Sequence, residues 1–314
     1  MSFAIISDTS CNVPMRILEP EDITLVPFSY YQKDDDSNVM QCIDIDSFNG
    51  KEFYDRIRQG ILYNTSQVSP GAYFDTISEY AKKGQDVLYI SMSSGISGSY
   101  NSSLVAKKML EEEFPERKFF MLDTKAASLG EGIVLLEAIE LRKQGLTIEE
   151  CYEKLSKMSE CVYQVFTVDS LRHLQRTGRL SNAAMIIGNL LNIKPILMGN
   201  ELGQIINVEK VRGNKKAIKE MADRYDKLVK DPGSQIVGIA HSDNEEDTAY
   251  LIELLNKSNP PKEILTVCYE PVTGSHVGPG TVALFFLGDE NVRSYQKAQT
   301  SIIDTVRNIV DDLT

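Results

Sequence analysis

Two clusters of hydroxyl side chains lie where the sequence changes from one kind of element to another. The first, TSQVSP, covers residues 65–70 and stands directly before apolar residues at helical spacing. Ser69 followed by Pro70 is enough to begin that helix, so Thr65 is not needed as a cap. Surplus hydroxyls beside a helix N-terminus form either a tight turn or a binding place for an anion. The first cluster leaves both interpretations open.

The second cluster, SMSSGISGSYNSS, covers residues 91–103 and follows an apolar run typical of a buried parallel strand. Ligands of open α/β sheets gather at the carboxyl ends of such strands, where backbone N–H groups and helix dipoles favour negative charge. Gly95 and Gly98 would let a ligand approach the backbone closely. A packed turn of small residues is the alternative interpretation. Together the two clusters favour an anion site without identifying the anion.

Candidate catalytic residues point to fewer chemistries. Nucleotide chemistry is disfavoured, because the chain has neither a G-x-x-x-x-G-K-[ST] loop nor G-x-G-x-x-G between a strand and a helix. A serine hydrolase stays open, with Ser97, His276 and Asp123 as nucleophile, base and orienting carboxylate, although the G-x-S-x-G elbow is absent. His276 is expected in a loop, His241 at a strand end and His173 at the surface. No histidine has clustered ligands near it, so no metal is expected.

A run of three arginines stands out in a chain whose net charge is −12. Arg172, Arg176 and Arg179 could bind an acidic partner or a phosphate, although pairing with surface carboxylates is the ordinary outcome. The negative charge argues against sequence-independent binding of nucleic acid or anionic membrane. We therefore expect no nucleic acid partner and at most transient membrane contact.

The composition is that of an ordinary soluble globule, with 42% hydrophobic and 25% charged residues among 314. Five scattered cysteines without a C-x-x-C pair are typical of reduced thiols in a cytoplasm. The start, MSFAIISDTS, lacks the basic region of a signal peptide, and the apolar runs are too short to span a bilayer. We expect a cytoplasmic protein.

Strand-like and helix-like segments alternate through the first half of the chain. Apolar runs at residues 3–8, 86–91 and 118–123 predict a parallel sheet covered by helices. One of the intervening helices is expected to begin at Asp46 or Ser47.

The second half mixes antiparallel strands with helices. The helix that precedes this half begins with Thr147 and Glu150, which stand at capping-box spacing. A turn at Gly199 and Asn200 is expected to join two antiparallel strands. The predicted fold class is α/β with two α/β domains, the first with a mainly parallel sheet and the second with a mixed sheet. The predicted boundaries are residues 1–160 and 161–288, followed by a helix over 289–314.

The ordered motifs together resemble the DegV family of bacterial fatty-acid-binding proteins. They are SDTSCNVP, TSQVSP, SSGISGSYNSS, DTKAASLGEG, LQRTGRLS, NIKPIL and SHVGPG, and the resemblance covers roughly residues 3–287. It implies a long-chain fatty acid held between two α/β domains, with its carboxylate at the cleft. It also implies that a separate ATP-dependent fatty acid kinase subunit phosphorylates this carboxylate for phospholipid synthesis. The chain itself would then be no enzyme and carry no cofactor.

The resemblance also implies roles for single residues. Thr65 and Ser97 would contact the carboxylate, and Gly98 would shape the anion site. Arg212 and His276 would face the carboxylate or the kinase. The three arginines of the run 172–179 are kept as partner or accessory contacts.

Four positions depart from the family pattern. Val68 stands where members often have proline, Ser99 replaces a threonine, and Val277 replaces another threonine. These three leave the anion site intact. Thr177 replaces the first glycine of a common Gly-Gly-Arg, which alters the surface expected to face a partner.

Burial of a lipid is energetically sound. Each buried methylene contributes about 0.8 kcal/mol, so a chain of about fourteen contributes on the order of 11 kcal/mol before binding costs. A buried carboxylate needs donors in place of water, and Thr65 and Ser97 are neutral donors. The chain-length preference cannot be predicted, because pocket residues cannot be told from core; candidates are Ile186, Ile187, Leu190 and Leu191. A pure interaction module that uses the arginine run would carry no lipid.

Overall fold

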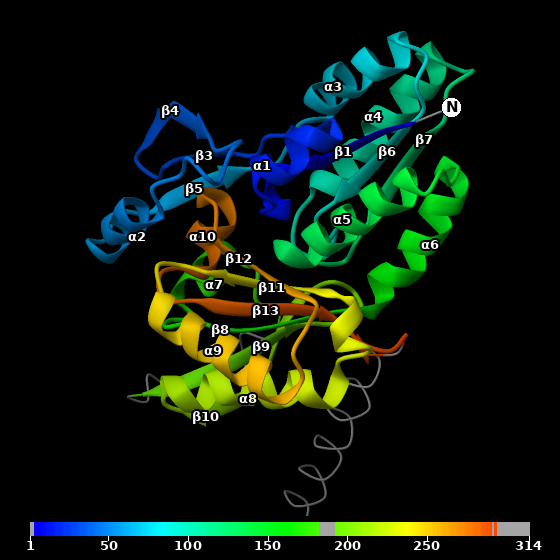
Figure 1. Cartoon of the computed structure of the whole chain (residues 1–314). Helices are drawn as coiled ribbons and strands as arrows, with labels where there is room; N and C mark the ends of the chain where they lie inside the picture. The colour runs from blue at the N-terminus through cyan, green and yellow to red at the C-terminus, as the bar shows by residue number, and fades with distance from the viewer. Residues whose placement is uncertain (1–2, 182–191, 291, 294–314) are drawn as a thin grey trace, which may run out of the picture.

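The computed structural model describes residues 3–181, 192–290 and 292–293 (Figure 1). The four candidate pocket residues between 186 and 191, and most of the helix expected over 289–314, lie outside the described residues. Within the described ranges, no helix is both long and apolar enough to cross a membrane.

A four-stranded parallel sheet organises the N-terminal half, as predicted. Its strand order is β2-β1-β6-β7, and every neighbouring pair is parallel. The strands are β1 (Ala4–Asp8), β2 (Ile23–Val26), β6 (Val87–Ser91) and β7 (Phe119–Asp123). Apolar side chains point to both faces of β1 and β6, because helices cover both. These are α3 (Pro70–Lys82) and α4 (Ser99–Glu113) on one face, α5 (Leu129–Lys143) and α6 (Ile148–Cys161) on the other.

A small antiparallel sheet in the same half was not predicted. Its strands, in the order β4-β3-β5, are β3 (Ser29–Gln32), β4 (Asp35–Gln41) and β5 (Tyr63–Ser66). β4 is polar and almost wholly exposed, so it lacks the apolar alternation that reveals a strand. β5 places Thr65 on a strand, opposite Tyr30, and not in the turn that one interpretation allowed.

The local helix signals had mixed outcomes. Ser69 caps α3 by accepting from Ala72 N, and the capping box at the start of α6 is present, so both predictions are confirmed. The expected helix start at Asp46 or Ser47 is wrong. Helix α2 (Gly50–Arg58) is capped by Asn49, whereas Ser47 Oγ donates to a carbonyl oxygen within the preceding turn.

The C-terminal half contains a six-stranded mixed sheet, in the order β10-β9-β8-β13-β11-β12. Only β11 and β12 pair in parallel among the described strands of this sheet, and the hairpin predicted at Gly199 and Asn200 is confirmed. The strands are β8 (Val162–Thr167), β9 (Ile193–Gly199), β10 (Ile205–Arg212), β11 (Ile236–His241), β12 (Glu263–Cys268) and β13 (Val282–Leu287). Helices α8 (Asn214–Leu228) and α9 (Glu245–Ser258) cover one face. The other face turns toward α5 and the N-terminal half (Figure 1).

The other described helical segments are short. They are α1 (Met15–Leu18), α7 (Arg172–Thr177), α10 (Pro271–Val277) and the 3-10 turns η1 (Thr9–Cys11), η2 (Glu19–Glu21) and η4 (Pro232–Ser234). α10 lies between the small antiparallel sheet and the mixed sheet (Figure 1). It carries His276, so the loop expected around this histidine is wrong.

The two halves are also joined at the turn between β9 and β10. Ser93 Oγ donates to Gly203 O over 2.8 Å, and this contact is buried. A side chain on Gly95 or Gly203 would overlap the opposite segment, and Gly203 has a φ of +70°. The glycines therefore permit the close approach of the two halves.

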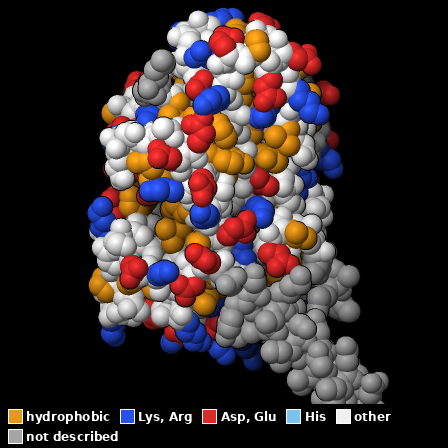
Figure 2. All heavy atoms as spheres, turned by 90° about the vertical axis from the view of Figure 1, so that its right-hand side faces the viewer, with side chains coloured by type: hydrophobic (Ala, Val, Ile, Leu, Met, Phe, Trp, Pro, Cys, Tyr) orange, Lys and Arg blue, Asp and Glu red, His pale blue; other side chains and the backbone are white. Residues whose placement is uncertain are grey.

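The charge of −12 is not gathered on the face shown in Figure 2. Acidic and basic side chains alternate there around apolar patches. Alternating signs on this face are typical of a solvated surface.

Candidate functional site

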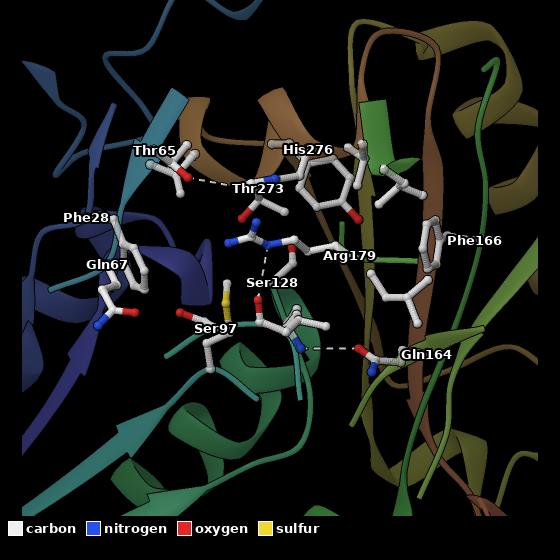
Figure 3. Close-up of a pocket in the computed structure, with 18 of the residues that line it drawn as sticks. Phe28, Thr65, Gln67, Ser97, Ser128, Gln164, Phe166, Arg179, Thr273 and His276 are labelled. Atoms are coloured by element: carbon white, nitrogen blue, oxygen red, sulfur yellow. Dashed lines mark hydrogen bonds between the residues drawn. The ribbon is translucent and has the colours of Figure 1, made fainter. Parts of the chain in front are cut away.

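A cavity of about 400 Å³ lies between the carboxyl edge of the parallel sheet and the inner face of the mixed sheet (Figure 3). Its apolar wall comes from both halves of the chain. The N-terminal half supplies Phe28, Met92 and Ile96, and the C-terminal half supplies Phe166 and Phe285. The cavity can therefore enclose an apolar group that reaches across the contact between the halves.

One end of the cavity carries a polar pair, Thr65 and His276. Thr65 Oγ1 and His276 Nε2 are 2.9 Å apart (Figure 3). Burial lowers the pKa of His276 to about 3, with a smaller effect from Arg179 and then Arg176, so the imidazole is neutral at ordinary pH. In the tautomer protonated at Nε2, the imidazole donates to Thr65 and leaves the threonine O–H free to donate to a ligand.

Ser97 lies in the loop between β6 and α4 and lines the same cavity. Its Oγ accepts from Ser99 N over 3.2 Å, so its own O–H is free to donate. Gly98 precedes α4, and a side chain there would overlap the amide of Gln67. Gln67 in turn donates to Ser102 Oγ over 3.0 Å. The two hydroxyl clusters of the sequence are thus packed together.

A buried series of hydrogen-bonded hydroxyl groups connects the loop that carries Ser97 to the core of the N-terminal half. Tyr73 OH lies 2.6 Å from both Ser99 Oγ and Tyr89 OH, and Tyr89 OH donates to Asp8 Oδ2 over 2.7 Å. Because Tyr89 has one proton and gives it to Asp8, Tyr73 must donate to Tyr89, and Ser99 to Tyr73. The first residue of α4 is therefore tied to a buried carboxylate.

That carboxylate shares a proton with a second buried acid. Ser10 Oγ contacts Asp8 Oδ1 and also Glu131 Oε2, the latter over 2.9 Å. Ser10 has one hydroxyl proton for two acid oxygens, so one of the carboxyl groups must be protonated. Burial raises the pKa of both acids, and the charge of Asp8 adds to the rise for Glu131, so the pair holds one proton between them.

The arginine run is divided between different surroundings. Arg179 lines the cavity, donates through Nε to Ile96 O over 3.3 Å, and extends its guanidinium across the polar end in Figure 3. Arg176 donates to Tyr63 O over 3.0 Å, and Arg172 is exposed. From the sequence, all three are expected as partner or accessory contacts, and the place of Arg179 in the cavity wall was not predicted. The available signal was Gly178, whose φ of +70° ends α7 and turns the chain.

Other predicted residues lie away from the cavity wall. Arg212 is exposed at the end of β10, and its expected contact with the carboxylate or a kinase stays a prediction. His173 is half-buried and packs against Gly278, so it is more than a surface residue. His241 is buried at the end of β11, where its Nδ1 accepts from Asn244 N over 3.3 Å.

The serine hydrolase constellation is not assembled. Asp123 accepts from Ser94 N and Ser94 Oγ and from Lys125 N. His276 contacts Thr65 instead, and in the described part of the chain no hydrogen bond joins Ser97, His276 and Asp123. The described residues also hold no group of three or more His, Cys, Asp or Glu side chains suited to a metal ion.

Comparison with known proteins agrees with this architecture. The family model described as "Uncharacterised protein, DegV family" matches residues 2–289. A DegV domain-containing protein of Clostridium perfringens is 38% identical over 287 residues, which are 91% of this chain and 98% of the relative.

Two solved structures share the fold at 30% identity. One is DegV of Bacillus subtilis, described as a fatty acid binding protein, with a TM-score of 0.79 over 92% of this chain and 100% of that one. The other is a fatty acid binding DegV family protein of Streptococcus agalactiae, with a TM-score of 0.81 over 92% of this chain and 99% of that one. The match along nearly the whole length of these relatives shows that the chain belongs to the DegV family.

Proposed function

We propose that this protein binds a long-chain fatty acid, with the acyl chain in the cavity and the carboxylate at Thr65 and Ser97. The observation that carries the proposal is that the hydroxyl groups of Thr65 and Ser97 line one largely apolar cavity. Apolar walls suit an alkyl chain, whereas a buried carboxylate needs donors at one end. The fatty acid binding described for the two solved relatives supports the same ligand class.

Arg179 adds a positive charge to this polar end. A guanidinium in the cavity wall lowers the cost of burying an anion. Because His276 is neutral, it serves here to orient Thr65 and does not form an ion pair. The carboxylate would thus be held by neutral hydroxyls with one cation beside them.

Presentation of the carboxylate to a separate ATP-dependent kinase is the finer part of the proposal. The chain lacks the sequence motifs that bind nucleotide phosphates, so phosphorylation would need another subunit. The exposed Arg172 and Arg212 are candidate contacts for that subunit. A pull-down of the kinase subunit with Arg172→Glu and Arg212→Glu variants, against the unmodified protein, addresses this part separately.

The ligand is tested first by organic extraction of the purified protein and mass spectrometry, where a fatty acid is expected. In a binding assay with the delipidated protein, Thr65→Val and Ser97→Ala should each weaken oleate binding about tenfold or more, because each removes a hydrogen bond to a charged group. Thr76→Val is the matched control, since its hydroxyl lies on α3 and bonds only within that helix. Unchanged affinity in both site variants would refute the proposal.

A further inference from the structure

Ser128 lies at the same edge of the parallel sheet as Ser97. Ser97 follows β6 and Ser128 follows β7, the neighbouring strand. The two loops are joined by a hydrogen bond from Ser93 N to Ala126 O over 2.8 Å. The wall of the cavity includes both serines, which Figure 3 labels.

The hydroxyl of Ser128 is buried and lies beside the Tyr269 phenol. Ser128 is 1% exposed, and its Oγ makes no hydrogen bond of ordinary geometry with any described residue. Ser128 and Tyr269 carry two O–H groups, so even when one hydroxyl donates to the other, one O–H has no acceptor among the described residues. A buried donor without an acceptor is costly and uncommon, so a missing acceptor is the natural explanation. Since Ser128 and Tyr269 both line the cavity, that acceptor would be a molecule in the cavity.

Ser128 precedes a helix but does not cap it, as a serine in this position usually does. Ser128 immediately precedes the fifteen-residue helix α5, yet its side chain accepts no N–H of that helix. Its φ of 53° and ψ of −137° lie in a region that glycine prefers. The side chain is therefore held toward the cavity and away from the usual capping contact, at a helix end whose dipole favours an anion.

A second hydroxyl stands beside it, from the other half of the chain. Tyr269 follows β12, is 3% exposed and lines the same cavity. Burial raises the pKa of the Tyr269 phenol, and Ser128 next to it lowers this pKa in part. The phenol therefore stays protonated at ordinary pH and is available as a donor.

Thr273 Oγ1 also lacks a hydrogen bond and lines the cavity, but it does not enter the inference. The carboxyl group of Glu270 accepts from Thr273 N over 2.6 Å, and the Thr273 side chain lowers the pKa of that carboxyl. Glu270 is thus the natural partner for this hydroxyl.

We propose that Ser128 and Tyr269 donate hydrogen bonds to the ligand's carboxylate and complete the acid site that Thr65 and Ser97 begin. A carboxylate has about four lone-pair directions, and these residues supply four hydroxyl donors. This inference rests on the proposed function, and it adds that these residues make the site selective for a carboxylate head group. A fatty acid should be preferred over the alcohol of equal length, because hydrogen bonds to a charged acceptor are the stronger ones.

The test compares palmitic acid with hexadecanol on delipidated full-length protein, by competition for a bound fluorescent acyl probe. The variants Ser128→Ala and Tyr269→Phe each remove one hydroxyl and little volume. Ser242→Ala is the matched control, because Ser242 is a buried serine whose hydroxyl also lacks a hydrogen bond but which lies outside the cavity wall.

Each site variant should weaken acid binding about tenfold and alcohol binding by at most about twofold, while Ser242→Ala changes neither. Equal losses for acid and alcohol, or no loss for the acid, would overturn the role of Ser128 and Tyr269 while fatty acid binding itself stands. If the unmodified protein binds neither compound, the proposed function falls together with this inference. Should Ser128→Ala fail to fold, Tyr269→Phe decides alone.

Discussion

At the scale of single residues, burial sets the protonation of three acids around the site. Asp8, Glu131 and Glu270 are each fully buried. Glu270 accepts hydrogen bonds from the N–H groups of Val272 and Thr273 and so caps α10, the helix that carries His276. Even so, burial raises the pKa of Glu270 from 4.5 to about 7. The position of His276 is therefore linked to a group that titrates near neutral pH.

Replacing Glu270 should change how stability depends on pH. With a folded-state pKa above its unfolded value, the native state holds the proton longer, so this group's stabilisation is complete below pH 4.5 and is lost as pH rises to about 7. The loss is on the order of 3 kcal/mol at most, at 1.36 kcal/mol per pKa unit. Urea unfolding at pH 5 and pH 8 should show this fall in the unmodified protein and a smaller one in Glu270→Gln.

The exposed Glu246 of α9 gives the control for that measurement. Glu246→Gln should keep the pH dependence of the unmodified protein. An identical fall in unfolding free energy for Glu270→Gln and the unmodified protein would contradict the assignment to Glu270.

Some residues of the candidate site could be predicted from the sequence, whereas others are revealed only by the three-dimensional structure. Thr65, Ser97 and His276 could be named from their motifs, and all three line one cavity. Ser128 could not be named, because its signal is its place beside Tyr269 in the cavity wall, which exists only once the two halves of the chain meet. Arg179 could be named only as a partner or accessory contact, since a periodic arginine run resembles a solvated helix face until the turn at Gly178 is known.

At the scale of elements, the β9–β10 turn can pack against the Ser93 loop because Gly203 has no side chain and adopts a positive φ. Alanine at Gly203 would combine strain at a φ of +70° with overlap against the Ser93 hydroxyl. We expect Gly203→Ala to lower the free energy of unfolding by about 2 kcal/mol or more. Denaturant unfolding measures this loss.

The variant Gly84→Ala separates the effect of backbone strain from the effect of steric overlap. Gly84 has a φ of +78° with no neighbouring atom within 4 Å of an added Cβ, so only the backbone strain remains. Its loss should be about 1 kcal/mol. Equal losses at the two glycines would mean that the turn does not pack as closely as described.

The elements that could be predicted are those with strong local signals. The buried strands of the parallel sheet, the caps at Ser69 and Thr147 and the β9–β10 hairpin each have an apolar run or a turn sequence. The small sheet was missed because β4 is stabilised by pairing and not by an apolar face. α10 was missed because its start, Glu270 with Pro271, follows directly on β12 without a polar turn sequence.

At the scale of the whole molecule, a ligand held by both halves should stabilise the folded chain. At a fatty acid concentration 100 times its Kd, the gain is about 2.7 kcal/mol. For a protein of 314 residues the Tm should rise by roughly 4 °C. Thermal unfolding across a series of oleate concentrations checks this, and Thr65→Val should need more oleate for the same rise. A Tm that does not change with oleate would contradict binding to the native state.

The shared cavity wall has a consequence for exchanging parts between relatives. Phe28 and Ile96 come from one half, whereas Phe166 and Phe285 come from the other, so neither half alone defines the shape of the interior. A chimera that joins the first half of this chain to the second half of a family member would have a cavity whose two walls come from different proteins. Its choice among acyl chains should resemble that of neither parent, which makes chain-length selectivity a property of the pairing.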